Sequence, residues 1–151
     1  MSCGTKNKNC YAKSCVRYYN DATQTFVAET PLTLQIAGAR VVDSGISIDA
    51  QPSSYTILKR GIYHLSADID FTADAVGTVV LGAYLDGVLL PCTRIVRSTS
   101  ANSPITAHYE TDLEFDNCCC DITKNITFGI TGGAGVGGTI THICTGITKI
   151  A

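Results

Sequence analysis

Alternating apolar and polar residues dominate the chain after residue 30 and predict β-strands. In residues 62–71, one face would be wholly apolar, carrying Tyr63, Leu65, Ala67, Ile69 and Phe71, and the other would carry Ile62, His64, Ser66, Asp68 and Asp70. Successive side chains of a strand point to opposite faces, so a period of two is typical of a strand with one buried face. Similar alternation predicts strands near residues 31–36, 46–48, 105–115, 122–130 and 139–150.

Turn residues separate these segments. Asp86-Gly87 lies between the apolar runs 78–85 and 88–90 and predicts a two-residue hairpin, because a type I′ turn needs positive φ at both central positions. Residues 59–61 indicate a second tight turn, and the polar stretch 97–104 predicts an exposed loop. Seven to nine short strands without an amphipathic helix predict an all-β sandwich or barrel.

Composition agrees with a single β-rich domain and excludes some functions. Charged residues make up 16% of the 151 residues, which argues against a largely disordered chain. The net charge of −2 argues against a nucleic-acid-binding function. We find no apolar run long enough to span a membrane and no secretory signal. We therefore expect synthesis in the cytosol and no membrane insertion.

The first residues differ from the rest in lacking apolar periodicity and in being rich in Lys and Asn. This change predicts an irregular N-terminal tail over residues 1–29, followed by a head domain over residues 30–151. We select six residues of the tail as candidate anchor or partner-binding residues, namely Cys3, Cys10, Cys15, Arg17, Tyr18 and Tyr19. The aromatic pair beside Arg17 suits a segment that docks on another protein. A lead-in that packs beneath the head is the alternative.

Eight cysteines leave three interpretations open. They are reduced thiols acting as small apolar residues, disulfides formed after release from a cell, or a metal site built on Cys3, Cys10 and Cys15. The spacing lacks the Cys-x-x-Cys pairs of zinc ribbons.

Residues 61–71, followed by 79–89 with their terminal Asp-Gly, resemble the middle of a C1q/TNF-like jelly roll. The last strand, residues 138–150, is similar to the apolar C-terminal strand of that family, which lies near a trimer axis. The resemblance implies an all-β jelly-roll sandwich, assembly as a homotrimer, and ligand binding without catalysis. Such domains occur in phage fibre heads and in bacterial surface and spore-coat proteins. No collagen-like stretch precedes the domain here.

Other candidate chemistry is weaker. The Gly129–Gly138 segment lacks the Lys of a phosphate loop, so we interpret it as a flexible loop. His64, Ser66 and Asp68 share a strand face, but same-face neighbours stand about 6.6–7 Å apart by strand rise, too far for a catalytic relay. His142 with Cys144 and Asp68 with Asp70 and Asp74 are incomplete metal sets. Asp112, Glu114 and Asp116 would form one acidic face, usually a solvated one.

From these observations we expect a non-enzymatic structural or binding protein without a cofactor. The preferred hypothesis is a trimeric phage head fibre or capsid decoration protein at the virion surface. Residues 1–29 would bind a capsid or other virion protein, and the head would face outward to a host glycan or protein. The alternative is a protein of the bacterial cell surface or spore outer layer with a ligand-binding head.

Overall fold

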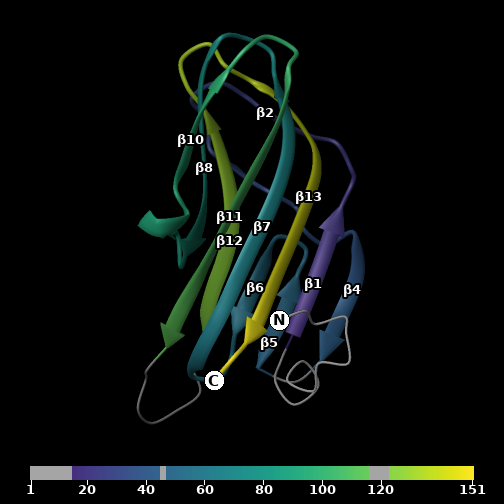
Figure 1. Ribbon diagram of the computed structural model, residues 1–151, viewed down its shortest axis with the longest axis vertical. Coiled ribbons are helices and arrows are strands. Elements are labelled where there is room, and N and C mark those ends of the chain that lie inside the picture. The colour runs from purple at the N-terminus through teal and green to yellow at the C-terminus, as the bar shows by residue number, and fades with distance from the viewer. Residues whose placement is uncertain (1–14, 45–46, 116–122) are drawn as a thin grey trace.

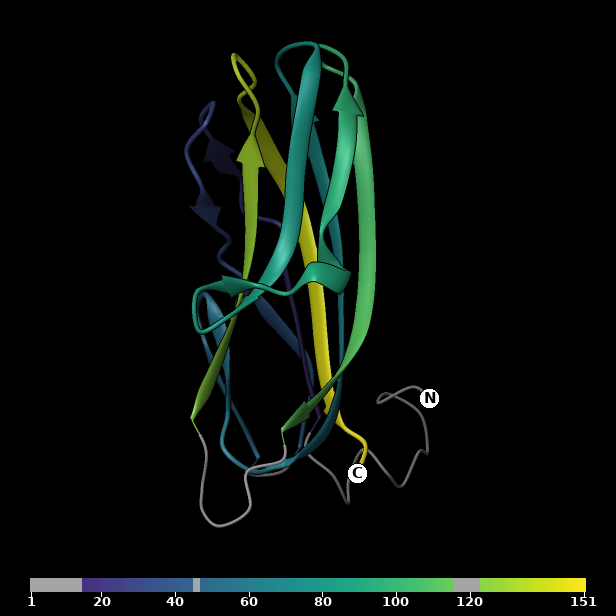
Figure 2. The ribbon, with the colours of Figure 1, turned by 90° about the vertical axis from the view of Figure 1, so that its left-hand side faces the viewer.

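A computed structural model describes residues 15–44, 47–115 and 123–151, and these residues form a β-sandwich of two antiparallel sheets. The two layers lie face to face and are elongated along their strands (Figures 1 and 2). The described residues contain no α-helix, only the 3-10 turn η1 (Pro91–Thr93). No helix among them is long and apolar enough to cross a membrane.

The first sheet has the strand order β11-β7-β13-β1-β4, with β2 paired to β13. Its strands are β1 (Cys15–Asn20), β2 (Gln24–Phe26), β4 (Ala39–Ser44), β7 (Gly61–Ala73), β11 (Pro104–Phe115) and β13 (Gly138–Lys149). The second sheet has the order β10-β8-β12-β6-β5, with β3 on β12 and β9 on β8. Its strands are β3 (Leu32–Thr33), β5 (Ile48–Gln51), β6 (Ser54–Ile57), β8 (Gly77–Leu85), β9 (Val88–Leu89), β10 (Ile95–Thr99) and β12 (Lys124–Gly132).

The core lies between the sheets and comes from the alternation seen in the sequence. In β7, every second residue from Tyr63 to Ala73 is buried, and the outward residues are half-buried. Tyr55 is fully buried, with its ring against Tyr18 and, edge-on, against Phe128. Removing this continuous apolar surface from water is the main term that stabilises such a sandwich.

The Asp86-Gly87 hairpin is confirmed. Both residues have positive φ, 49° and 85°, and Leu85 pairs with Val88 across the turn. The loop expected at 97–104 is wrong in its first part, because β10 continues through Thr99 and pairs with β8. Thr99 turns inward there and donates a hydrogen bond to the carbonyl of Ala75. Pairing with a neighbouring strand therefore outweighs the polar composition of this segment.

The N-terminal segment also differs from the irregular tail that we expected over residues 1–29. Residues 15–20 form β1, which pairs with β13 on one side and β4 on the other. Val16 and Tyr18 of this strand belong to the core, as does Phe26 of β2. The sandwich thus begins at least as early as Cys15, and residues 1–14 lie outside the described part of the chain.

Candidate functional site

The outward face of β7 and β11 carries several of the ionisable side chains that we singled out from the sequence. The two strands pair antiparallel, with His64 opposite Asp112 and Asp68 opposite His108. Because the inward residues of both strands fill the core, their polar residues must share the solvent side. The register therefore merges two separate polar stripes into one surface.

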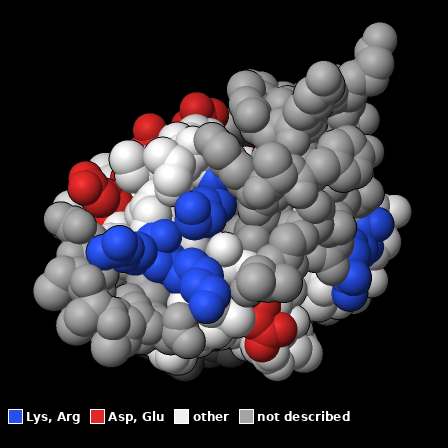
Figure 3. Space-filling view, turned by 90° about the horizontal axis from the view of Figure 1, so that it is seen from below, with Lys and Arg blue, Asp and Glu red and all other residues white. Residues whose placement is uncertain are grey.

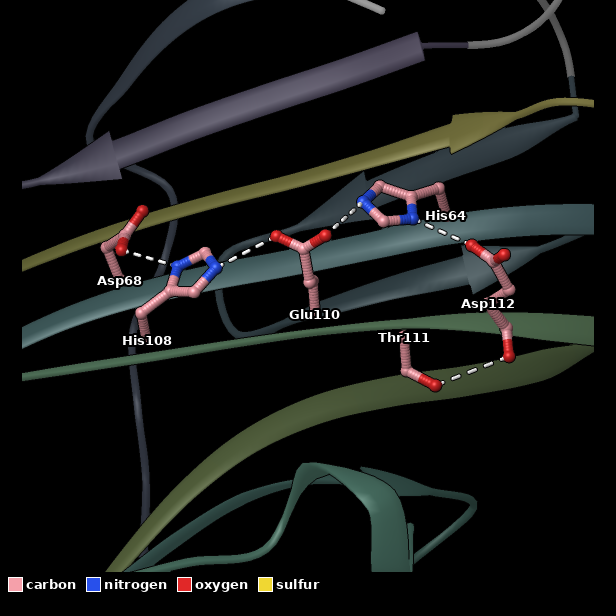
Figure 4. Close-up of polar contacts among 6 residues, drawn as sticks. All are labelled: His64, Asp68, His108, Glu110, Thr111 and Asp112. Carbon is pink, nitrogen blue, oxygen red and sulfur yellow. Dashed lines mark hydrogen bonds and ion pairs between the residues drawn. The ribbon is translucent and has the colours of Figure 1, made fainter.

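Five side chains on this surface form a continuous chain of contacts, which we call the histidine row: Asp68, His108, Glu110, His64 and Asp112 (Figure 4). The Nδ1 atom of His64 lies 2.7 Å from a carboxylate oxygen of Asp112, and Nδ1 of His108 lies 2.7 Å from Asp68. Glu110 stands between the imidazoles, 2.9 Å from Nε2 of His108 and 3.7 Å from Nε2 of His64.

This arrangement favours protonated histidine. Hydrogen bonds to Glu110 and then to Asp68 raise the pKa of His108 above its usual value. Both ring nitrogens of His108 face carboxylate oxygens, which only accept hydrogen bonds, so the protonated ring, which can donate from both nitrogens, is favoured over the neutral one. The side chain of His108 is 49% exposed, so solvent and salt weaken these attractions.

The remaining histidine of the chain lies on the same outward face. His142, on β13, contacts the carboxylate of Asp21 through Nδ1, and its ring lies 6.4 Å from that of Tyr19. All three histidines of the protein therefore contact carboxylates on the outer surface of the first sheet.

A cavity lies beside the histidine row, but its described residues do not form a metal site. A cavity of about 220 Å³ beside the histidine row is lined by Arg17, Ser66 and Thr148 together with members of the row. Among the described residues, no group of three or more His, Cys, Asp or Glu side chains has a geometry that could hold a metal ion. Arg17 also adds a positive charge beside the cavity, which opposes a cation there.

The six anchor candidates do not form one site in the described structure. Cys3 and Cys10 lie outside the described residues. Cys15 is buried, and the hydroxyl of Thr148 lies 3.4 Å from its sulfur. Tyr18 is buried, as the packing alternative expected, with the guanidinium of Arg40 5.7 Å from its ring centre. Arg17 and Tyr19 lie on the outward face, where Tyr19 is 36% exposed, and their role in partner binding stays a prediction.

The other candidates from the sequence either make structural hydrogen bonds or lie away from the histidine row. Asp74 accepts a hydrogen bond from the backbone of Gly137 and so holds the turn before β13, while Asp70 accepts one from Thr106. The glycine-rich segment is a loop only in part: residues 129–132 belong to β12, and residues 133–137 connect β12 to β13 in the other sheet, with Val136 fully buried. Asp116 lies outside the described residues.

The histidine row itself was missed at the level of sequence. Its two stripes, in residues 64–70 and 108–114, were each visible as polar faces. Their partnership depends on which strands are neighbours and on the register between them, and no local pattern contains that information.

These sheets, their order and their packing form a jelly-roll sandwich, the fold of C1q/TNF-like domains. Three solved structures illustrate the likeness. Murine APRIL at pH 5.0 has a TM-score of 0.63 at 15% identity, covering 91% of this chain and 99% of that chain. Vertex protein P5 of PRD1 has a TM-score of 0.59 at 14% identity, covering 91% and 97%. The globular domain of zebrafish complement 1qA has a TM-score of 0.55 at 13% identity, covering 89% and 95%.

These identities are low, so the similarity concerns the fold. No family model and no curated protein matches the sequence.

Proposed function

We propose that this chain is a non-enzymatic structural protein of a phage particle, a homotrimeric head fibre or capsid decoration protein. The observation that carries the proposal is the likeness to PRD1 vertex protein P5, a phage protein that shares the fold over 91% of this chain. The N-terminal segment attaches the trimer to a capsid or other virion protein, and the jelly roll faces outward.

The charge distribution supports this orientation. β1 begins at the lower end of the sandwich in Figure 1, so residues 1–14 join the sandwich there. Seen from below, Lys and Arg side chains gather on part of this end (Figure 3). Lys59 and Arg60 lie in the turn before β7, and Lys149 ends β13 with its Nζ 3.0 Å from the carbonyl of Ala151. A basic end suits contact with an acidic partner surface.

The strand edges support self-association. β11 is twelve residues long and forms an edge of the first sheet. Such an edge presents unpaired backbone groups that other chains can join, and a closed homotrimer removes that hazard by covering it.

Native mass spectrometry of the purified chain tests the assembly. We expect one species at three times the chain mass of 16.0 kDa. A clean monomer over a range of concentrations contradicts the proposal.

Attachment is tested with antibodies against the head. We expect label on phage particles that carry the full chain and none on particles made with a chain lacking residues 1–14. Label on bacterial spores or cell surfaces, and none on particles, would instead favour the surface-protein alternative.

A further inference from the structure

A cavity on the outward face of the second sheet has the composition of a small-molecule site. It has a volume of about 310 Å³ and lies over β8, β12 and β3. We call it the Tyr84 groove, and its lining comprises Pro31, Leu32, Thr33, Tyr84, Gly87, Thr127, Gly129, Ile130 and Thr131. The histidine row lies on the other sheet, so the two surfaces are independent.

The floor of the groove depends on a glycine. A Cβ atom at position 129 would lie only 2.8 Å from Cε1 of Tyr84, so the ring can rest against β12 only because residue 129 has no side chain. Thr33 of β3 pairs with Gly129 from the other side of β12 and bounds the groove there. A half-buried aromatic ring therefore lies against the sheet, between two walls, with part of its surface open to solvent.

The lining is neutral, and this sets the class of ligand. It contains no charged residue. Three other cavities of the described structure are lined by ionisable side chains: one by Asp74, one by Arg60 and Lys149, and one by members of the histidine row. Hydroxyl groups come from Thr33, Thr127 and Thr131. A charged ligand would lose its hydration without gaining an opposite charge. A neutral ligand with one apolar face and several hydroxyls could contact both the Tyr84 ring and the threonine hydroxyls of the groove.

We propose that the Tyr84 groove binds a neutral pyranose sugar, as a terminal unit of a surface glycan. The C–H face of the sugar stacks on the electron-rich face of the Tyr84 ring, and its hydroxyls exchange hydrogen bonds with the threonines. The volume lies at the small end of the range for ligand sites, about 300–1,000 Å³, which fits one or two sugar rings.

This inference deepens the proposed function, on which its biological role rests, by naming the ligand of the outward-facing head. Binding by one ring and a few hydroxyls is weak, with a Kd of about 1 mM. Three copies of the groove on one trimer, and many trimers on one particle, raise the effective affinity for a glycan-coated surface without any new contact.

The experiment is a titration of the full chain with methyl glycosides of glucose, galactose, mannose and N-acetylglucosamine, followed by NMR of the glycoside protons for every variant and also of the tyrosine ring protons for the wild type. We expect at least one glycoside to shift the Tyr84 signals with a Kd of about 1 mM. Tyr84→Phe, which keeps the ring, should bind within about threefold of wild type, and Tyr84→Ala should bind at least about tenfold more weakly.

The matched control is Tyr19→Ala, which removes a partly exposed tyrosine from the other sheet and should leave the affinity unchanged. Thr131→Val, which removes one hydroxyl at nearly constant volume, gives a second test should Tyr84→Ala fold poorly, and should weaken binding several-fold. Absence of binding by all four glycosides, or wild-type binding by both Tyr84→Ala and Thr131→Val, overturns the inference. A trimer that binds no glycoside contradicts this inference alone, and a monomer that binds one contradicts only the assembly.

Discussion

A buried hydroxyl pair shows how single residues hold the two sheets in place. The hydroxyl of Tyr55, on β6, lies 2.7 Å from that of Thr145, on β13, so this hydrogen bond joins opposite sheets through the core. Burial raises the pKa of Tyr55 far above its usual range, with the hydrogen bond to Thr145 opposing the rise, so the phenol stays neutral. The Tyr55 hydroxyl also hydrogen-bonds with the backbone of Tyr18, so it is held by two contacts within the core.

We therefore expect Tyr55→Phe to destabilise the protein by about 1–3 kcal/mol, since it leaves the Thr145 hydroxyl buried without its partner. Adding Thr145→Val to this variant should recover part of the loss, because both polar groups are then gone. Chemical denaturation of the wild type, both single variants and the double variant measures the coupling. Additive effects of the two substitutions would show that the hydrogen bond contributes nothing.

The histidine row gives the stability of the protein a dependence on pH. The pKa of His108 is raised in the folded state, chiefly by its hydrogen bond to Glu110 and then by that to Asp68. A group with a raised folded pKa contributes stability in full below its unfolded pKa, about 6.5 for histidine, and loses it as pH rises through the folded value. The exposure of the row keeps the effect small.

We expect the melting temperature of the wild type to fall as the pH rises above about 6.5, and to fall less for His108→Gln. His142→Gln, which alters the histidine paired with Asp21 and leaves the row intact, is the matched control and should keep the part of the fall that His108 causes. Differential scanning calorimetry in low salt checks this. If the melting temperatures of wild type and His108→Gln fall equally steeply with pH, the histidine row is not the source of the pH dependence.

At the scale of the secondary-structure element, the predictions that rest on local sequence signals were correct. The Asp86-Gly87 turn and the strand that contains Tyr63 and Phe71 depend only on neighbouring residues, and both were found. β1 escaped detection because its buried residues include Cys15 and Asn20 and do not alternate cleanly with exposed ones. Asn20 is buried and donates a hydrogen bond to the carbonyl of Gln35, so a residue that looks like part of a polar tail lies inside.

The hairpin also gives a clean test of backbone conformation. Gly87 has φ of 85° and no atom within 4 Å of the position where a Cβ would stand, so a substitution there meets conformational strain without a steric clash. Gly87→Val should cost about 1–3 kcal/mol, whereas Gly87→Asn should cost clearly less because Asn tolerates positive φ better. Thermal unfolding of the two variants compares them. Equal midpoints for Gly87→Val and wild type would contradict the turn assignment.

At the scale of the whole molecule, the position of β1 sets where the chain can be shortened. β1 lies inside the first sheet, between β13 and β4, and its Val16 and Tyr18 fill the core. A truncation at residue 30 would therefore remove a central strand and β2 together, although the sequence suggested residue 30 as the start of the head.

We expect a chain that begins at Cys15 to keep a cooperative unfolding transition within a few degrees of the full-length protein. A chain that begins at Thr30 should unfold at a much lower temperature or fail to fold, because it loses the buried side chains of β1 and of Phe26. Circular dichroism melts of both truncations decide between the two boundaries. Similar melts for both would show that residues 15–29 are dispensable to the sandwich.

The pairing of β1 with β13 has a consequence for the timing of folding during synthesis. Cys15 lies opposite Thr148, so β1 can pair early with β4 but cannot pair with β13 until the ribosome has made more than a hundred further residues. β7 likewise lacks both of its neighbours, β11 and β13, until these later strands have been synthesised. Contacts this distant along the chain make folding slow, and the nascent strands stay exposed to aggregation in the meantime. The protein should therefore depend strongly on chaperones when it is produced rapidly in a host cell.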